Sequence, residues 1–205
     1  MDNLMDLLTS QLAGNQMDEI SKHLGADKDQ VESAVGTALP LLFSALAKNA
    51  STEEGANALA GALDRDHDGS VLDNITSLLG GGQQQQQQKA VDGSGILKHV
   101  LGGKRNMLES LISNNSGLNS QKTSGLMELL APMVLGQLGK QKKQSGMDAA
   151  GIASLLGGML NQNQRRAPKS MGLLNSLLDQ DGDGSINDDV ANIGMKFLGN
   201  MFRKR

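Results

Sequence analysis

The chain has 205 residues and a net charge of −3, a length that allows one large domain or two small ones. The absence of cysteine excludes disulfides, thiol catalysis and the usual structural zinc sites. With no Trp, no Tyr and three Phe, the core has to be built from Leu, Met, Ala, Val and Ile. The mildly negative charge is not typical of a general nucleic-acid binder.

The N-terminal segment carries acidic rather than basic residues and has no long apolar stretch, so it does not have the pattern of a signal peptide. No part of the chain has the roughly 18 uninterrupted apolar residues of a membrane span. We therefore expect a cytoplasmic protein without a membrane-spanning segment.

Apolar residues recur at helical spacing along most of the chain, beginning at residues 4–12 and 31–39. Asp27 is placed to cap the second of these helices, and Ser-x-x-Glu at residues 51–54 is a capping box for a later one. Further along, Asn119 or Ser120 can begin another helix. Alternating β-branched runs are absent, so the pattern predicts an all-α, multi-helix bundle.

Two prolines interrupt apolar stretches, at Pro40 and Pro132. Proline is well accommodated in the first turn of a helix, where its missing N–H costs nothing. We therefore expect two short helices to meet at each proline, with a single kinked helix as the alternative.

An internal repeat relates residues 25–40 to residues 117–132 at an offset of 92 residues. Each copy begins with glycine, places Asp or Asn two residues later and ends at proline. The repeat predicts two related helical units. The acidic motifs described below are offset by 115 residues instead, so the second unit carries an insertion, which we place in the polar linker-like stretch 161–170.

A run of six glutamines at residues 83–88 follows three glycines. Such a segment cannot bury apolar surface and is typical of a linker. The expected organisation is an N-terminal helical unit at 1–80, a Gly/Gln-rich linker at 81–93 and a C-terminal helical unit at 94–205.

The first unit contains the pattern Asp-x-Asp-x-Asp-Gly-Ser, which is the first half of an EF-hand calcium loop. Asp64, Asp66 and Asp68 occupy loop positions 1, 3 and 5, where alternate side chains converge on one hard cation. Glycine at position 6 allows the sharp bend, and Ser70 at position 7 offers its backbone carbonyl.

The same pattern recurs in the second unit, with Asp179, Asp181, Asp183 and Ser185 in the same four roles. One such motif is compatible with acids that only cap a helix and form Asx turns. Two copies with the same Gly-Ser tail favour a cation site, because clustered carboxylates repel one another unless a cation or protons neutralise them.

Both loops lack the bidentate Glu that an EF-hand carries at position 12, where Ile75 and Val190 stand instead. Acids occur earlier: Asp73 and Asp188 at position 10 and Asp189 at position 11 are the candidates for the missing ligand. We therefore predict two weakened sites for Ca²⁺, with Mg²⁺ left open, and a stronger second loop because the first contains Arg65.

No phosphate-binding loop, nucleophile elbow or His-Glu-x-x-His motif is present, so we expect no enzymatic activity. Basic clusters occur at residues 140–143, 165–166 and 203–205, but base-stacking aromatics are missing, which disfavours nucleic-acid binding. The apolar C-terminal segment 193–202 can close the bundle or provide a face for self-association.

Four segments together resemble the bacterial YidB-like proteins, a group catalogued as domain of unknown function 937. They are Leu-Gly-Ala-Asp at 24–27, Ala-Leu-Pro-Leu-Leu at 38–42, Ala-Gly-Ala-Leu-Asp-Arg-Asp-His-Asp-Gly-Ser at 60–70 and Leu-Leu-Asp-Gln-Asp-Gly-Asp-Gly-Ser at 177–185. The resemblance covers most of the chain outside the glutamine run. It implies an all-helical, homeodomain-like bundle and no particular activity or catalytic residue.

The sequence thus predicts a non-enzymatic helical protein that binds a divalent cation in two loops, for structural stabilisation or for regulation. One alternative is a helical scaffold or oligomerisation protein, with self-association or a protein partner, whose acidic loops are only turns. A second alternative is a homeodomain-like, weak DNA-binding protein.

Overall fold

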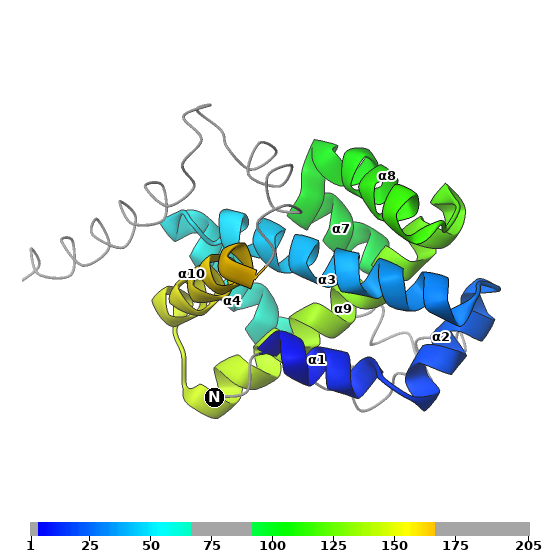
Figure 1. Ribbon diagram of the computed structural model, residues 1–205. Coiled ribbons are helices and arrows are strands. Elements are labelled where there is room, and N and C mark those ends of the chain that lie inside the picture. The colour runs from blue at the N-terminus through cyan, green and yellow to red at the C-terminus, as the bar shows by residue number, and fades with distance from the viewer. Residues whose placement is uncertain (1–3, 67–91, 167–205) are drawn as a thin grey trace, which may run out of the picture. The chain divides into compact units, whose positions relative to one another are not determined.

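The computed structural model describes residues 4–66 and 92–166, and in these two ranges it contains helices and no strand (Figure 1). The all-α prediction is therefore confirmed for the described part of the chain. Side chains are described for these ranges up to residue 160.

The chain begins with α1 (Leu4–Leu12) and α2 (Asn15–Leu24), which pack against each other. Helix α1 buries Leu4, Leu8 and Leu12, one residue per turn, whereas Leu7 is 38% exposed. Helix α2 ends at Gly25, whose φ of 58° is left-handed, and the amides of Gly25 and Ala26 donate to the last carbonyls of the helix. Glycine suits this position because a Cβ would be strained there.

Two long helices, α3 (Lys28–Asn49) and α9 (Ser120–Ser145), continue through Pro40 and Pro132. The expectation that two short helices meet at each proline was wrong. A proline inside a helix costs about 3 kcal/mol. Residues next to the two prolines are buried, among them Leu39 and Leu41 in α3 and Met133 in α9. Burying each such side chain contributes about 1.5–3 kcal/mol of stability. Packing therefore outweighs the local cost.

Pro132 also leaves a carbonyl without its helical N–H partner, that of Glu128 four residues earlier. A Cβ built on Gly93 would lie 1.9 Å from this carbonyl oxygen. Gly93 is buried at the start of α7 (Gly93–Leu101), so the N-terminus of α7 meets α9 backbone to backbone. Only glycine permits such an approach.

Helix α7 is followed by the short 3₁₀ helix η2 (Gly102–Lys104) and by α8 (Arg105–Ser116). Asp92 caps α7 by accepting a hydrogen bond from the amide of Gly95 at 2.9 Å. Helix α9 packs against α1, α2, α7 and α8, and it runs between them in Figure 1.

The remaining described helices are α4 (Glu53–Arg65) and α10 (Ala149–Arg166). The predicted capping box at 51–54 does not start α4. Thr52, rather than Ser51, accepts a hydrogen bond from the amide of Gly55 at 3.1 Å, and the hydroxyl of Ser51 donates to the carbonyl of Lys48. Helix α10 continues to Arg166, so the first residues of the stretch expected as a linker at 161–170 are helical.

The described helices form two compact units, and neither is continuous in the sequence. One contains residues 4–42, 63–66 and 92–145, and the other contains residues 43–62 and 146–166. Within the first unit, α1 and α2 pack on α9, so helices from both sides of the glutamine run share a core. The linker proposed at 81–93 falls almost entirely outside the described residues and stays a prediction.

By length and composition alone, α3 could cross a membrane, which none of the other described helices could. Of its most apolar 18-residue window, 67% is buried within the protein. This is the behaviour of a core helix.

Candidate functional site

The first acidic loop begins where α4 ends. Asp64 lies in the last turn of the helix, Arg65 is its final residue and Asp66 follows directly. The side chain of Asp64 is 62% exposed. Loop position 1 therefore coincides with the end of a helix, which is the helix–loop order of an EF-hand.

Asp64 forms an ion pair with a lysine side chain of the same protein. The ammonium group of Lys142, near the end of α9, donates a hydrogen bond to Asp64 Oδ1. The side chain of Lys142 is only 15% exposed, so α9 holds the ammonium group against the end of α4. No sequence pattern indicates this pair, because its partners are 78 residues apart.

The other predicted ligands lie outside the described residues: Asp68, Ser70, Asp73, Asp179, Asp181, Asp183, Ser185, Asp188 and Asp189. Within residues 4–66 and 92–166, no group of three or more His, Asp or Glu side chains is placed to hold a metal ion. Both cation sites therefore remain sequence predictions, of which the structure places Asp64 and Asp66.

The two turns of the internal repeat have matching local structure. Helix α3 begins at Lys28 after Gly25, and α9 begins at Ser120 after Gly117, whose φ of 75° is also left-handed. Of the two predicted caps for α9, Asn119 is the one used, since its Oδ1 accepts from the amide of Lys122 at 2.9 Å. Each turn thus joins two helices through three residues, as in a helix–turn–helix.

The two turns also contact each other. Gln30 Nε2 donates to the carbonyl oxygen of Gly117 at 3.1 Å, and Lys122 Nζ donates to the carbonyl oxygen of Gly25. Ser33 Oγ lies 3.4 Å from the carbonyl oxygen of Asn115. The first turns of α3 and α9 are therefore engaged in contacts within the protein.

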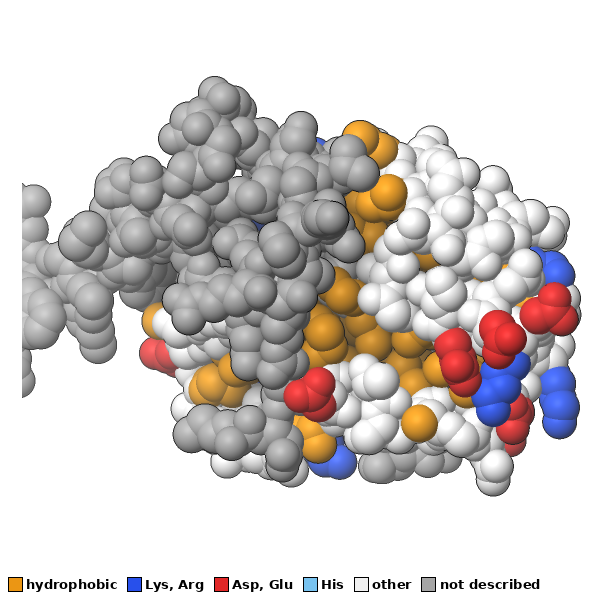
Figure 2. Space-filling view, viewed as in Figure 1, with side chains coloured by type: hydrophobic (Ala, Val, Ile, Leu, Met, Phe, Trp, Pro, Cys, Tyr) orange, Lys and Arg blue, Asp and Glu red, His pale blue; other side chains and the backbone are white. Residues whose placement is uncertain are grey.

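These contacts weigh against DNA recognition by α3. In a DNA-binding helix–turn–helix, the first residues of the second helix reach the base edges. Here Gln30 is occupied by the opposite turn, and the exposed neighbours Asp29 and Glu32 are acidic. Acidic and basic side chains are mixed over the region of α2 in Figure 2, whereas phosphate binding calls for a basic surface.

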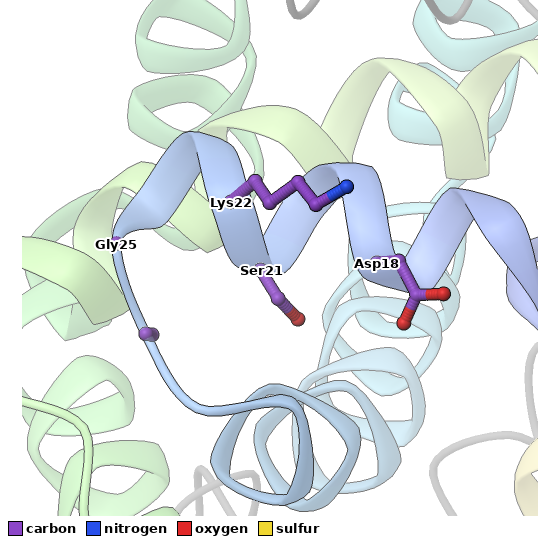
Figure 3. A pocket seen from close by; sticks show the side chains of 5 residues that line it. Asp18, Ser21, Lys22 and Gly25 are labelled. Carbon is purple, nitrogen blue, oxygen red and sulfur yellow. The ribbon is translucent and has the colours of Figure 1, made fainter.

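A shallow surface hollow of about 400 Å³ lies beside the α2 turn, lined by Asp18, Ser21, Lys22, Gly25 and Ala26 (Figure 3). The hydroxyl of Ser21 donates to the carbonyl of Met17 at 2.8 Å. Asp18 forms an exposed ion pair with Lys28 at 2.8 Å, which lowers the pKa of the Asp18 carboxyl. The Ser21 hydroxyl and the Asp18 carboxylate are thus engaged within the protein, and we assign no ligand to the hollow.

A polar network around Arg105 joins three helices of the first compact unit. Its guanidinium donates to Glu109 at 2.7 Å, to Glu128 at 2.7 Å, to Ser124 at 2.8 Å and to Ser94 at 3.1 Å. The hydrogen bond that Arg105 donates to Glu109 raises the pKa of Arg105 above its ordinary value, with a smaller contribution from its hydrogen bond to Glu128. A raised pKa means that the contribution of the arginine to stability is lost only as the pH rises through the folded-state pKa, so it is fully present at neutral pH.

Comparison with known proteins identifies a family and no function. The sequence model of a family described as "Bacterial protein of unknown function (DUF937)" matches residues 6–141. No curated protein and no solved structure matches the chain. The matched range includes most of α1, all of α2 to α4, the first acidic loop, α7, α8 and most of α9.

Proposed function

Since the chain belongs to the DUF937 family of bacterial proteins, whose function is unknown, we propose a role from its own residues: it is a non-enzymatic, cytoplasmic helical protein that binds Ca²⁺ or a similar divalent cation in two Asp-rich loops. The observation that carries the proposal is the double occurrence of Asp-x-Asp-x-Asp-Gly-Ser, beginning at Asp64 and at Asp179. Three alternating carboxylates followed by glycine form the first half of a calcium loop.

The position of Asp64 supports this proposal. It lies in the last turn of α4, where an EF-hand places the first ligand, and it is exposed enough to reach an ion. A bound metal would tie the loop to the chain that follows it, and binding free energy of this kind adds to the stability of the fold.

Calorimetric titration of the metal-stripped full chain tests the proposal. We expect saturable, weak binding of Ca²⁺, because neither loop has the Glu at position 12. A parallel titration with Mg²⁺ measures how far the loops distinguish the two ions. The double variant Asp179→Ala/Asp181→Ala should lose the stronger of the two binding events. The matched control Asp6→Ala/Asp29→Ala removes the same charge from exposed helix positions and should bind as the parent does.

Absence of heat at millimolar Ca²⁺ in the parent protein would refute the metal proposal. The acidic loops would then be turns, and the helical scaffold would become the preferred interpretation. Retention on DNA that falls with salt would instead revive the DNA-binding alternative.

Lys142 should act as an internal competitor for the first loop. Metal binding at Asp64 requires its ammonium group to move away, and a partly exposed ion pair contributes up to about 1 kcal/mol. In the Asp179→Ala/Asp181→Ala background, Lys142→Gln is therefore expected to tighten Ca²⁺ binding about two- to fivefold. Calorimetry measures this change directly.

Lys143→Gln is the matched control, because it removes the same charge from the neighbouring, exposed position. Its effect should be smaller, since it acts only through the general electrostatic field. Equal affinities for the Lys142→Gln and Lys143→Gln variants would show that the pair with Asp64 does not compete with the metal.

A further inference from the structure

The turns around Gly25 and Gly117, with the helix ends that they join, form two helix–turn–helix corners. The contacts between these two corners are reciprocal. At the offset of 92 residues that relates the turns, Gly25 corresponds to Gly117 and Gln30 corresponds to Lys122. The structure shows Gln30 bonded to Gly117 and Lys122 bonded to Gly25. Gln30 and Lys122 are therefore counterparts that each bond to the glycine in the turn of the other copy.

A second pair of contacts follows the same arrangement to within one residue. Ser33 corresponds to Gly125, and Ser33 Oγ lies 3.4 Å from the carbonyl oxygen of Asn115 in α8. A Cβ built on Gly125 would lie 3.2 Å from Cδ2 of Leu24, at the end of α2. Leu24 corresponds to Ser116, the neighbour of Asn115. Thus α3 of the first copy meets the end of α8, and α9 of the second copy meets the end of α2.

Reciprocal contact of this kind defines an isologous interface, in which the same surface of two subunits meets across a two-fold axis. Here both surfaces belong to one chain. The interface extends beyond the two interhelical turns, because α1 and α2 of the first copy also pack against α9 of the second.

We infer that the protein is an internal dimer of one helical repeat. The corner around Gly25 in one copy and the corresponding corner around Gly117 in the other form the surface by which each copy recognises the other. In the native chain the occupant is the other half of the same molecule. When the two halves are not covalently joined, the same surface holds them together in trans. This inference is independent of the proposed metal sites.

Cutting the full chain between the copies tests the inference. A protease site replaces the glutamines at 83–88, and the purified protein is cleaved and analysed by size-exclusion chromatography with light scattering. We expect the two halves to elute together at micromolar concentration with the mass of the uncut chain. Separate elution of the halves would overturn the inference.

A variant then shows whether the corner is the recognition surface. Gly125→Phe places a ring against Leu24, where the space is already tight, and should make the cut halves separate. Gly36→Phe is the control, since Gly36 is exposed in α3 with nothing within 4 Å of a Cβ built there, and its halves should stay together. Co-elution of the cut Gly125→Phe protein would overturn the assignment of this surface.

A cross-link provides a readout that does not depend on how a bulky variant folds. The chain contains no cysteine, so Ser33→Cys with Asn115→Cys creates one pair across the corner. The two-fold relation predicts that the counterpart pair, His23→Cys with Gly125→Cys, cross-links with a similar short reagent in comparable yield. Cross-linking of the first pair without the second would contradict the reciprocal geometry.

Discussion

Gly93→Ala is expected to lower the free energy of unfolding by about 3 kcal/mol, at the upper end of what overpacking usually costs. The new methyl group would lie 1.9 Å from the carbonyl oxygen of Glu128, which is a rigid backbone atom of α9. Helix α7 would have to move away from α9, and its buried side chains Leu97 and Leu101 would lose part of their packing. Urea unfolding monitored by circular dichroism measures the change.

Gly36→Ala is the matched control for this prediction. Gly36 lies inside α3, is exposed and has open space around its Cβ position. There the substitution should be neutral or should stabilise the protein by up to about 1 kcal/mol, because alanine is the better helix former. Equal stabilities for the two variants would show that α7 and α9 do not approach as closely as described.

Arg105→Ala is expected to cost about 2–3 kcal/mol. The guanidinium is 21% exposed and joins α7, α8 and α9, and its removal leaves Glu109, which is 13% exposed, without its cation. Hydrogen bonds to charged groups are worth about 1.5–3 kcal/mol, and an orphaned carboxylate adds a desolvation penalty. Thermal and urea unfolding of the variant test this value.

Two controls isolate the geometry of the network. Arg105→Lys keeps the charge but cannot reach several acceptors with one planar fork, so it should recover only part of the stability. Lys28→Ala breaks the exposed pair with Asp18, in which both side chains are 46% exposed, and should change stability little. A loss in Lys28→Ala as large as in Arg105→Ala would mean that net charge, rather than the network, matters.

Local patterns in the sequence were sufficient to predict that the described part of the chain is helical and where several of its helices begin. Apolar spacing identified the buried face of α1, and turn residues identified the starts of α3 and α9, with Asn119 as the observed cap. These features depend on neighbours within one or two helical turns. The same offset of 92 residues that was visible in the sequence relates the two left-handed glycines, Gly25 and Gly117.

Contacts between distant residues could not be predicted in this way. The prolines were misread because their local cost is visible in the sequence, whereas the burial of neighbours such as Leu41 and Met133 is not. The partners of Arg105 lie up to 23 residues away, and Lys142 is 78 residues from Asp64. For the candidate site, the sequence predicted a pattern of ligands, and the structure added the ammonium group of Lys142, which pairs with Asp64 at the first loop position.

The reciprocal contacts between the two corners affect which amino-acid substitutions such a protein can accept. In a symmetric homodimer every substitution occurs twice, so a residue that suits one side of the axis must suit the other as well. In the internal dimer inferred above, the two copies lie in one chain, so this constraint would not apply. Gln30 and Lys122 already make equivalent contacts with different side chains. Glu128 accepts a hydrogen bond from Arg105, whereas its counterpart at the offset of 92 residues is Gly36, which has no side chain to do so. In the internal dimer that we infer, one half can thus acquire features that would be incompatible with two-fold symmetry.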